Sequence, residues 1–175
     1  MVENWIECYH HLGAHRETVE PFWAASAVHL LAPGARPWAA MTVEGIEGTG
    51  GPAETWIPGM DETQARDLSV WSAFPLLLGG GTSGHAFWLQ IEPIDVTHHR
   101  VTWHLLAHPD RMLDAAATDA LMEEITAVHV EDMKSCRDVQ AGLASGRIPA
   151  FRLTRLEAPV ADFQRWVAGR LAGTV

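Results

Sequence analysis

The clearest hydrophobic pattern is of strand type and occupies the middle of the chain. Residues 38–43, 85–92 and 100–108 mix aliphatic, aromatic and β-branched residues in short runs, which predicts strands. The last two runs flank a short turn and therefore predict an antiparallel hairpin. Residues 44–70 are rich in Gly, Pro, Glu and Asp, which favours a loop, and the three glycines at 79–81 predict a flexible break.

Helical patterns lie at the two ends of the sequence. Apolar residues recur every three or four positions over 114–145, which predicts the longest helix, and a last helix is expected over about 160–171. Near the start, residues 2–11 and 21–31 each predict a short helix. Strands followed by a long helix predict an α+β fold, with helices on one face of an antiparallel sheet. The length suits one domain, so the whole of 1–175 is expected to form it.

One charged residue interrupts the apolar stripe of the long predicted helix, which comprises Leu121, Ile125, Val128, Cys136, Val139 and Leu143. The spacing demands an apolar residue at 132, where the sequence has Asp132. A carboxylate on a buried stripe is costly unless it is paired or bound to a metal. The alternative is a slight turn of the helix that leaves Asp132 solvated at the edge. Glu131 lies about 100° away around the helix and is expected to be solvated.

The N-terminal segment supplies histidines that could share a metal with such a carboxylate. Two histidines and one carboxylate make the facial triad of non-heme Fe(II) enzymes. His10 and His15 would point apart on a continuous helix, but a turn at Gly13 would bring His15 back. Glu7, one turn before His10, could accept the N–H of its ring and fix its tautomer. The spacing alone equally fits two hydrogen-bonded histidines without a metal, and His11 could replace either ligand.

The bulk composition argues against several classes of partner. The net charge is −10 with neutral histidines, and the 12 lysines and arginines are scattered, which disfavours binding to nucleic-acid phosphates. No apolar run approaches the roughly 18 residues that span a bilayer, and the first residues do not form a signal peptide, so we expect no membrane association and a cytoplasmic location. Cys8 and Cys136 are far apart, and we expect both thiols to remain reduced.

Two separated motifs resemble the catalytic domain of Rieske-type non-heme iron oxygenases, the ring-hydroxylating oxygenase alpha subunits. Residues 3–10 read ENWIECYH and are followed after four residues by His15, which is similar to the start of that domain. The Glu131-Asp132 pair and the VQ-x-GL-x-S string at 139–145 are similar to its C-terminal helix, whose aspartate is an iron ligand. The resemblance extends in the same order along nearly the whole chain.

The resemblance implies a function as well as a fold. Fe(II) would be held by His10, His15 and Asp132, and O₂ would be activated there to hydroxylate or demethylate a small apolar or aromatic substrate. Asn4 and Glu7 belong to the same motif, and in the family the acidic residue at the place of Glu7 bridges the catalytic histidine to the Rieske cluster of a neighbouring subunit. The implied helix-grip fold has a curved antiparallel sheet wrapped around a long helix and a deep pocket.

The sequence departs from the family in its iron–sulfur ligands. A Rieske cluster needs two Cys and two His ligands, and Cys8 and Cys136 are not spaced for one, so neither a cluster nor a Rieske domain is expected in this chain. Electrons would then come from a separate Rieske protein and reductase, unless the sequence is a fragment of a larger oxygenase. Another alternative is a redox-inactive helix-grip module that binds a small apolar ligand. The family forms trimers, and we expect a weaker or different homo-oligomer here.

Overall fold

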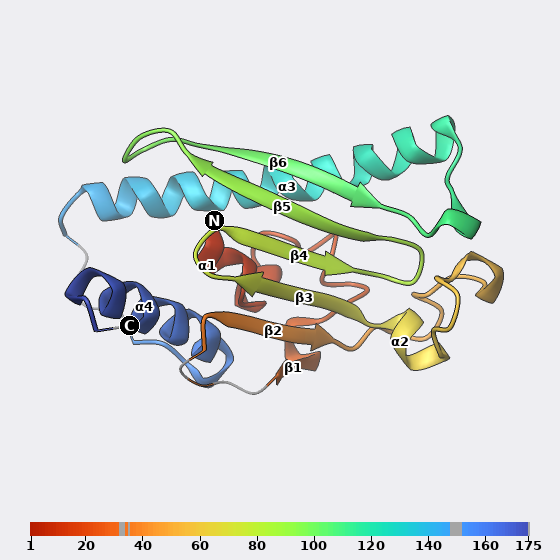
Figure 1. Cartoon of the computed structure of the whole chain (residues 1–175), viewed down its shortest axis with the longest axis horizontal. Helices are drawn as coiled ribbons and strands as arrows, with labels where there is room; N and C mark the ends of the chain where they lie inside the picture. Colours follow the sequence, from red (N-terminus) through yellow and green to blue (C-terminus); the bar gives the residue numbers. More distant parts are fainter. Residues whose placement is uncertain (32–33, 35, 148–151, 175) are drawn as a thin grey trace.

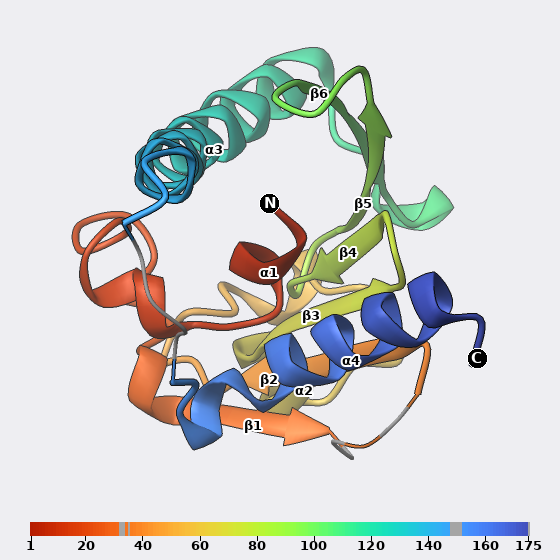
Figure 2. The same ribbon diagram turned by 90° about the vertical axis from the view of Figure 1, so that its left-hand side faces the viewer.

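The computed structural model describes residues 1–31, 34, 36–147 and 152–174, and it has the predicted α+β architecture. Six strands form one antiparallel sheet in which sequence neighbours pair, with α3 behind it (Figure 1). The sheet curves from β1 to β6 around α1, and α3 lies across the open side of the curve (Figure 2). The strands are β1 (Val28–Leu31), β2 (Trp38–Val43), β3 (Leu68–Ala73), β4 (Leu77–Gly81), β5 (Ala86–Pro93) and β6 (His99–Leu106). The helices are α1 (Val2–Trp5), α2 (Glu62–Arg66), α3 (Ala115–Ala144) and α4 (Ala158–Ala172).

Alternation along the strands creates an apolar inner face of the sheet. In β2, Met41 and Val43 are buried on this face, whereas Trp38 is exposed on the other. Leu78 of β4 and Leu89 of β5 are directly paired in register and fully buried. The N-terminal segment packs here, and Trp5 contacts all three clusters of core residues. The predicted strand over 38–43 and the predicted β5–β6 hairpin are thus confirmed.

The predicted helix over 21–31 is wrong. After a short 3-10 turn over Ala25–Ala27, the chain forms β1, whose Val28 pairs with Val43 of β2. Val28 and Leu30 pack against the buried core, which shows that tertiary contacts outweigh the weak helical preference of this segment. The expected loop over 44–70 likewise contains α2, which begins with a capping box between Asp61 and Gln64.

The three consecutive glycines do not form a flexible break, because they lie inside β4. Gly79 pairs with Trp71 of β3 on one side and with Trp88 of β5 on the other. A Cβ atom on Gly79 would overlap the indole ring of Trp71, which lies over it. Glycine is therefore required here for the close approach of a bulky neighbour, which is one of its recognised uses in strand interiors.

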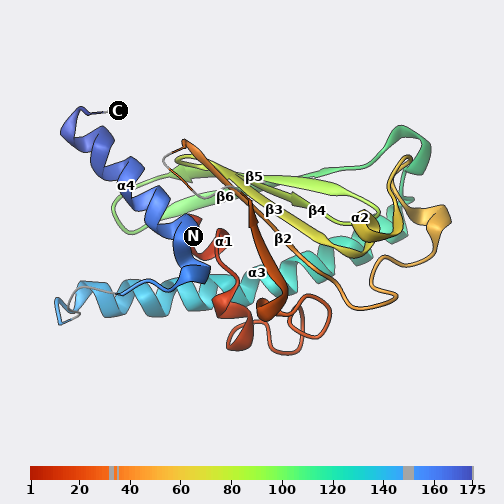
Figure 3. The ribbon, with the colours of Figure 1, turned by 90° about the horizontal axis from the view of Figure 1, so that it is seen from below.

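The long helix α3 is only loosely packed against the rest of the molecule. It runs over the inner side of the sheet with α1 between them (Figure 3). Of its thirty residues only Asp132 is buried, and none belongs to the clusters of core residues. Its His129 makes an edge contact with the ring of Trp103 at 5.6 Å between centroids. Val139 and Leu143 are 58% and 49% exposed. The prediction that the apolar stripe faces the core is therefore wrong at the C-terminal end of the helix.

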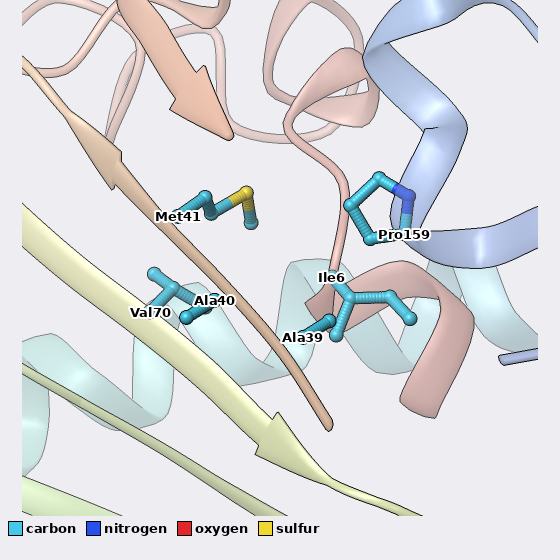
Figure 4. Close-up of a pocket in the computed structure, with 6 residues that line it drawn as sticks. All are labelled: Ile6, Ala39, Ala40, Met41, Val70 and Pro159. Atoms are coloured by element: carbon cyan, nitrogen blue, oxygen red, sulfur yellow. The ribbon is translucent and has the colours of Figure 1, made fainter. Parts of the chain in front are cut away.

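The last helix, α4, closes one end of the sheet. Phe163 of α4 packs edge-on against Phe74 at 5.1 Å, and Val160 is buried in the same cluster. At this junction Ile6, Met41 and Pro159 come from three different segments and surround an apolar gap too small for a water molecule (Figure 4). The predicted helix over 160–171 is thus confirmed, two residues longer at its start and one at its end. None of the helices in the described part of the chain is long and apolar enough to cross a bilayer.

Candidate metal centre

The N-terminal segment brings two histidines together through a break in its helix. α1 ends at Trp5, and a separate 3-10 turn follows over Tyr9–Leu12, in place of the single helix expected over 2–11. Gly13 ends this turn, and its amide donates to the carbonyl oxygen of His10 at 3.0 Å. As a result, the rings of His10 and His15 lie side by side with 5.0 Å between their centroids.

Asp132 approaches this pair of histidines from α3. Its Oδ1 atom lies 3.0 Å from Nε2 of His15 and 3.5 Å from Nε2 of His10. The side chains of Asp132 and His15 are 6% and 3% exposed, so this polar cluster is shielded from water. Within the described ranges, these three form the one group of at least three His, Cys, Asp or Glu side chains close enough to share an ion. The sequence candidates for iron ligands therefore meet at one point.

Glu7 and Asn4 each hold one of these side chains. Nδ1 of His10 lies 2.6 Å from Oε1 of Glu7. A carboxylate can only accept, so His10 carries a proton on Nδ1 and turns Nε2 toward Asp132. Asn4 Nδ2 donates to Oδ1 of Asp132 at 2.7 Å, which fixes the orientation of that carboxylate.

Glu131, expected to be solvated, is only partly so, because its carboxylate holds the second histidine. Its Oε2 atom accepts from Nδ1 of His15 at 2.8 Å and from the hydroxyl of Thr18 at 2.7 Å. Adjacent carboxylates on α3 thus contact opposite edges of one imidazole, Glu131 at Nδ1 and Asp132 at Nε2. The sequence signal for Glu131 is its place beside Asp132, but the direction of its side chain depends on where α3 crosses the N-terminal segment.

His11, the alternative ligand, lies next to the cluster but does not join it. Its Nδ1 atom is 3.3 Å from the carbonyl oxygen of Trp23, and its ring is turned edge-on to His10 at 4.9 Å between centroids. Burial lowers the pKa of His11 to about 4, so its imidazole is neutral at ordinary pH. His11 therefore serves as a packed wall of the site.

The electrostatic environment favours the charged forms of Asp132 and His15 at the centre of the cluster. Burial by itself raises the pKa of Asp132, but hydrogen bonds from His15 and Asn4 outweigh it and hold that pKa below its usual range. Burial likewise disfavours protonated His15, yet its bonds to Asp132 and Glu131 raise the pKa of the ring. The cluster thus favours a negative charge on Asp132 and a positive charge on His15.

The donor set fits a divalent ion of the non-heme iron type. Two imidazole nitrogens and one carboxylate oxygen are the facial triad that leaves coordination positions open. Ligands at right angles, each roughly 2.1 Å from an ion, lie about 3 Å apart. The 3.0 and 3.5 Å separations from Asp132 Oδ1 agree with this geometry. Both histidines also present Nε2 to the shared point, because carboxylates occupy both Nδ1 atoms.

Comparison with known proteins decides the family. The family model for the catalytic domain of ring-hydroxylating alpha subunits matches residues 1–173. The chain belongs to this family. Non-heme iron and oxygenase chemistry are therefore the family's attributes, in agreement with the metal-binding cluster. No curated protein matches the chain by sequence.

Solved structures of Rieske monooxygenases share the fold. A quaternary ammonium Rieske monooxygenase, studied for carnitine oxidation by gut microbiota and inter-subunit electron transfer, is 18% identical with a TM-score of 0.70. The quaternary ammonium Rieske monooxygenase CntA in complex with inhibitor MMV12 is 16% identical with a TM-score of 0.65. Both alignments cover 95% of this chain but only 45% and 44% of the solved chains. The chain thus spans less than half the length of these relatives.

The candidate ligands of this ring-hydroxylating domain open onto a large cavity of about 630 Å³. Its wall on the sheet side carries a cluster of aromatic rings, in which Trp5, Phe87 and Trp103 contact one another at 5.4 to 6.0 Å. The opposite wall is α3, from Leu121 to Asp132. These two residues are eleven positions apart, so the cavity extends roughly 16 Å along the helix from the metal-binding cluster.

The cysteine nearest the cluster is not a ligand. Cys8 is buried, and its Sγ atom contacts Sδ of Met41 at 3.7 Å. Burial raises the pKa of this thiol to about 12, so it remains protonated. Cys136, on α3, is half-buried and also free. Although Cys8-Tyr9-His10 has the C-x-H spacing of a Rieske half-motif, His10 faces Asp132 instead.

Proposed function

We propose that the chain is the iron-binding catalytic domain of a Rieske-type oxygenase. Fe(II) would be held by His10, His15 and Asp132, and a small apolar or aromatic molecule would be hydroxylated or demethylated in the adjacent cavity. The observation that carries this proposal is the convergence of these three side chains, with Nε2 atoms turned inward, on the wall of a mostly apolar cavity. Such a combination of ligands and cavity suits oxygen chemistry on an organic substrate.

Each part of the site has a task in this proposal. Bound Fe(II) would supply the activation of O₂ when electrons arrive. Glu7 keeps the proton of His10 on Nδ1, so that Nε2 is available as a ligand. Asn4 keeps Oδ1 of Asp132 directed at the histidines. The aromatic wall around Trp103 excludes water and holds the apolar body of the substrate beside the site.

Electrons would come from a Rieske centre outside these residues. The two cysteines of the sequence do not offer the ligands of a Rieske cluster, and we propose that 1–175 is the catalytic domain alone. Glu7 would link that centre to His10, since its carboxylate lies 2.6 Å from Nδ1 of His10 and its side chain is 13% exposed. Inter-subunit electron transfer in the quaternary ammonium relative supports such an arrangement. A trimer or another homo-oligomer remains a proposal on the same basis.

The alternative of a redox-inactive carrier is less well supported. A carrier needs the cavity and a fixed α3, but it has no use for two imidazole Nε2 atoms and a carboxylate oxygen that meet at one point. Burying such a group is costly, and the metal is the ligand that makes it useful.

The test is anaerobic titration with Fe(II), with bound iron measured after desalting. We expect one iron per wild-type chain and little iron in His10→Ala, His15→Ala or Asp132→Ala. His29→Ala is the matched control, because His29 is an exposed histidine of β1. Turnover of an apolar substrate should require an added Rieske protein and reductase. Full iron content in His15→Ala would refute the assignment.

A further inference from the structure

Acidic side chains predominate around the cavity. Glu7, Glu124 and Asp132 line it, and among the described residues that form its wall there is no lysine or arginine. Glu131 adds a third carboxylate to Glu7 and Asp132 at the metal-binding cluster. These three negative charges exceed the two positive charges of a divalent ion by one. The cavity thus remains negative when its metal site is filled.

Glu124 lies on α3, two turns before Asp132, and it is exposed. Unlike Glu7 and Asp132, it has no hydrogen-bond or ion-pair partner in the part of the chain that the structure describes. His85, on the opposite side of the cavity, is half-buried, and burial lowers its pKa, so it adds no positive charge at neutral pH. A positively charged group entering the cavity would therefore meet a free carboxylate, and a negatively charged group would meet no lysine or arginine on the described wall.

We propose, building on the proposed function, that the cavity selects its substrate by charge: it accepts uncharged and cationic apolar molecules and rejects carboxylates and other anions. A carboxylate held in this cavity beside Glu124, away from the metal ligands, would lose its water without gaining a lysine or arginine partner, which is strongly unfavourable. An ammonium group would gain from the aromatic rings of Trp5 and Trp103, which line the cavity, and from Glu124. The volume of about 630 Å³ leaves room for a molecule of two fused rings.

Three probes with the same ring system test the proposal: 2-naphthalenemethanol, 2-naphthylmethylamine and 2-naphthoate. Binding is measured by calorimetry at pH 7 with the full chain loaded with Zn(II), which keeps the divalent charge and prevents turnover. We expect the amine to bind about 2- to 5-fold more tightly than the alcohol, as for a solvent-exposed ion pair. The carboxylate should bind on the order of 100-fold more weakly than the alcohol. A carboxylate that binds as tightly as the alcohol would overturn the proposal, as would failure of all three to bind.

Variants of Glu124 separate its contribution from that of the metal site. Glu124→Gln should remove the preference for the amine, and Glu124→Lys should improve binding of 2-naphthoate by about 10-fold. Glu123→Lys is the matched control, because Glu123 is an exposed neighbour on the same helix that does not line the cavity. An equal effect of Glu123→Lys would overturn a local role of Glu124.

The same titrations in the metal-free protein distinguish this proposal from the proposed function. If the protein binds no divalent ion but still ranks the three probes as expected, the metal-site assignment fails and the charge selection stands. If it binds the ion through His10, His15 and Asp132 but does not discriminate against 2-naphthoate, the charge selection fails and the metal site stands.

Discussion

Replacement of Glu131 by glutamine tests whether the carboxylate beside Asp132 prepares the site for metal. Glu131→Gln keeps the shape of the side chain and removes its charge. In the structure this carboxylate accepts from both His15 and Thr18, at 2.8 and 2.7 Å. It therefore holds the proton of His15 on Nδ1 and increases the basicity of Nε2, the atom proposed to bind the metal. We expect weaker metal binding in the variant, with the fold unchanged.

The expected loss of metal affinity follows from the two hydrogen bonds that Glu131 accepts and from the exposure of its side chain. A hydrogen bond to a charged group contributes about 1.5–3 kcal/mol, which corresponds to roughly 10- to 150-fold in an equilibrium constant. Loss of a group that orients a metal-binding histidine typically reduces metal affinity by about 10–100-fold. The Glu131 side chain is 32% exposed, so water screens part of its charge, and glutamine can still accept a weaker bond. We therefore expect a loss near the lower limit, about 10-fold.

Competition of Zn(II) with a coloured chelator measures this affinity directly. Glu123→Gln, the same change on an exposed part of α3, serves as the control. Thr18→Val should weaken binding by a few-fold in the wild type and have little effect in Glu131→Gln, because the Thr18 hydroxyl is linked to the His15 ring through the Glu131 carboxylate. A loss in Glu131→Gln no larger than in Glu123→Gln would refute the reasoning. Equal effects of Thr18→Val in both backgrounds would refute the role of Thr18.

Three further changes test other parts of the structure. Burial raises the pKa of the Cys8 thiol to about 12, so at pH 8 iodoacetamide should modify Cys136 and spare Cys8 in the native protein, as peptide mapping would detect. In the metal-free protein, burial lowers the pKa of His11 from 6.5 to about 4, so the unfolded chain binds the proton first, and His11 should contribute a loss of about 2 kcal/mol in stability between pH 7 and pH 5, opposite in sign to the contribution of His15, whose pKa is raised. Urea unfolding should show a smaller fall for His11→Gln. Gly79→Ala would place a methyl group in the indole ring of Trp71, and it should lower the free energy of unfolding, measured with urea, by about 1–3 kcal/mol. Gly84→Ala should have little effect, because the nearest atom to its added Cβ is 3.6 Å away.

Local patterns in the sequence predict those elements whose own residues show a clear periodicity or an unusual residue at one position. The β5–β6 hairpin and α3 follow from periodicity, and α3 lies within one residue of its predicted ends. Asp132 stands out because a carboxylate interrupts an apolar stripe, and in the structure it is the buried residue of that helix. For His10 and His15, the glycine between them indicated the turn that brings their rings together.

Other features depend on contacts between distant segments and could not be read locally. The composition of residues 21–31 favours a helix, but pairing with β2 makes Val28–Leu31 a strand. Gly79 resembles a hinge until the Trp71 ring is placed over it. The direction of the Glu131 side chain depends on how α3 crosses the N-terminal segment. Its partner there, His15, lies 116 residues earlier in the sequence. Val139 lies on the apolar stripe yet is 58% exposed, which periodicity cannot reveal.

The loose apolar packing of α3 and its polar attachment are parts of one arrangement. A helix packed fully against the sheet would leave no room for a substrate, and here no residue of α3 belongs to the core clusters while the cavity lies beneath it. The helix must then be positioned by contacts other than apolar ones. Asp132 and Glu131 provide them, through hydrogen bonds to Asn4, His15 and Thr18 of the N-terminal segment. The residue that breaks the apolar stripe is thus the one that keeps the cavity open and places the candidate metal ligands on its wall.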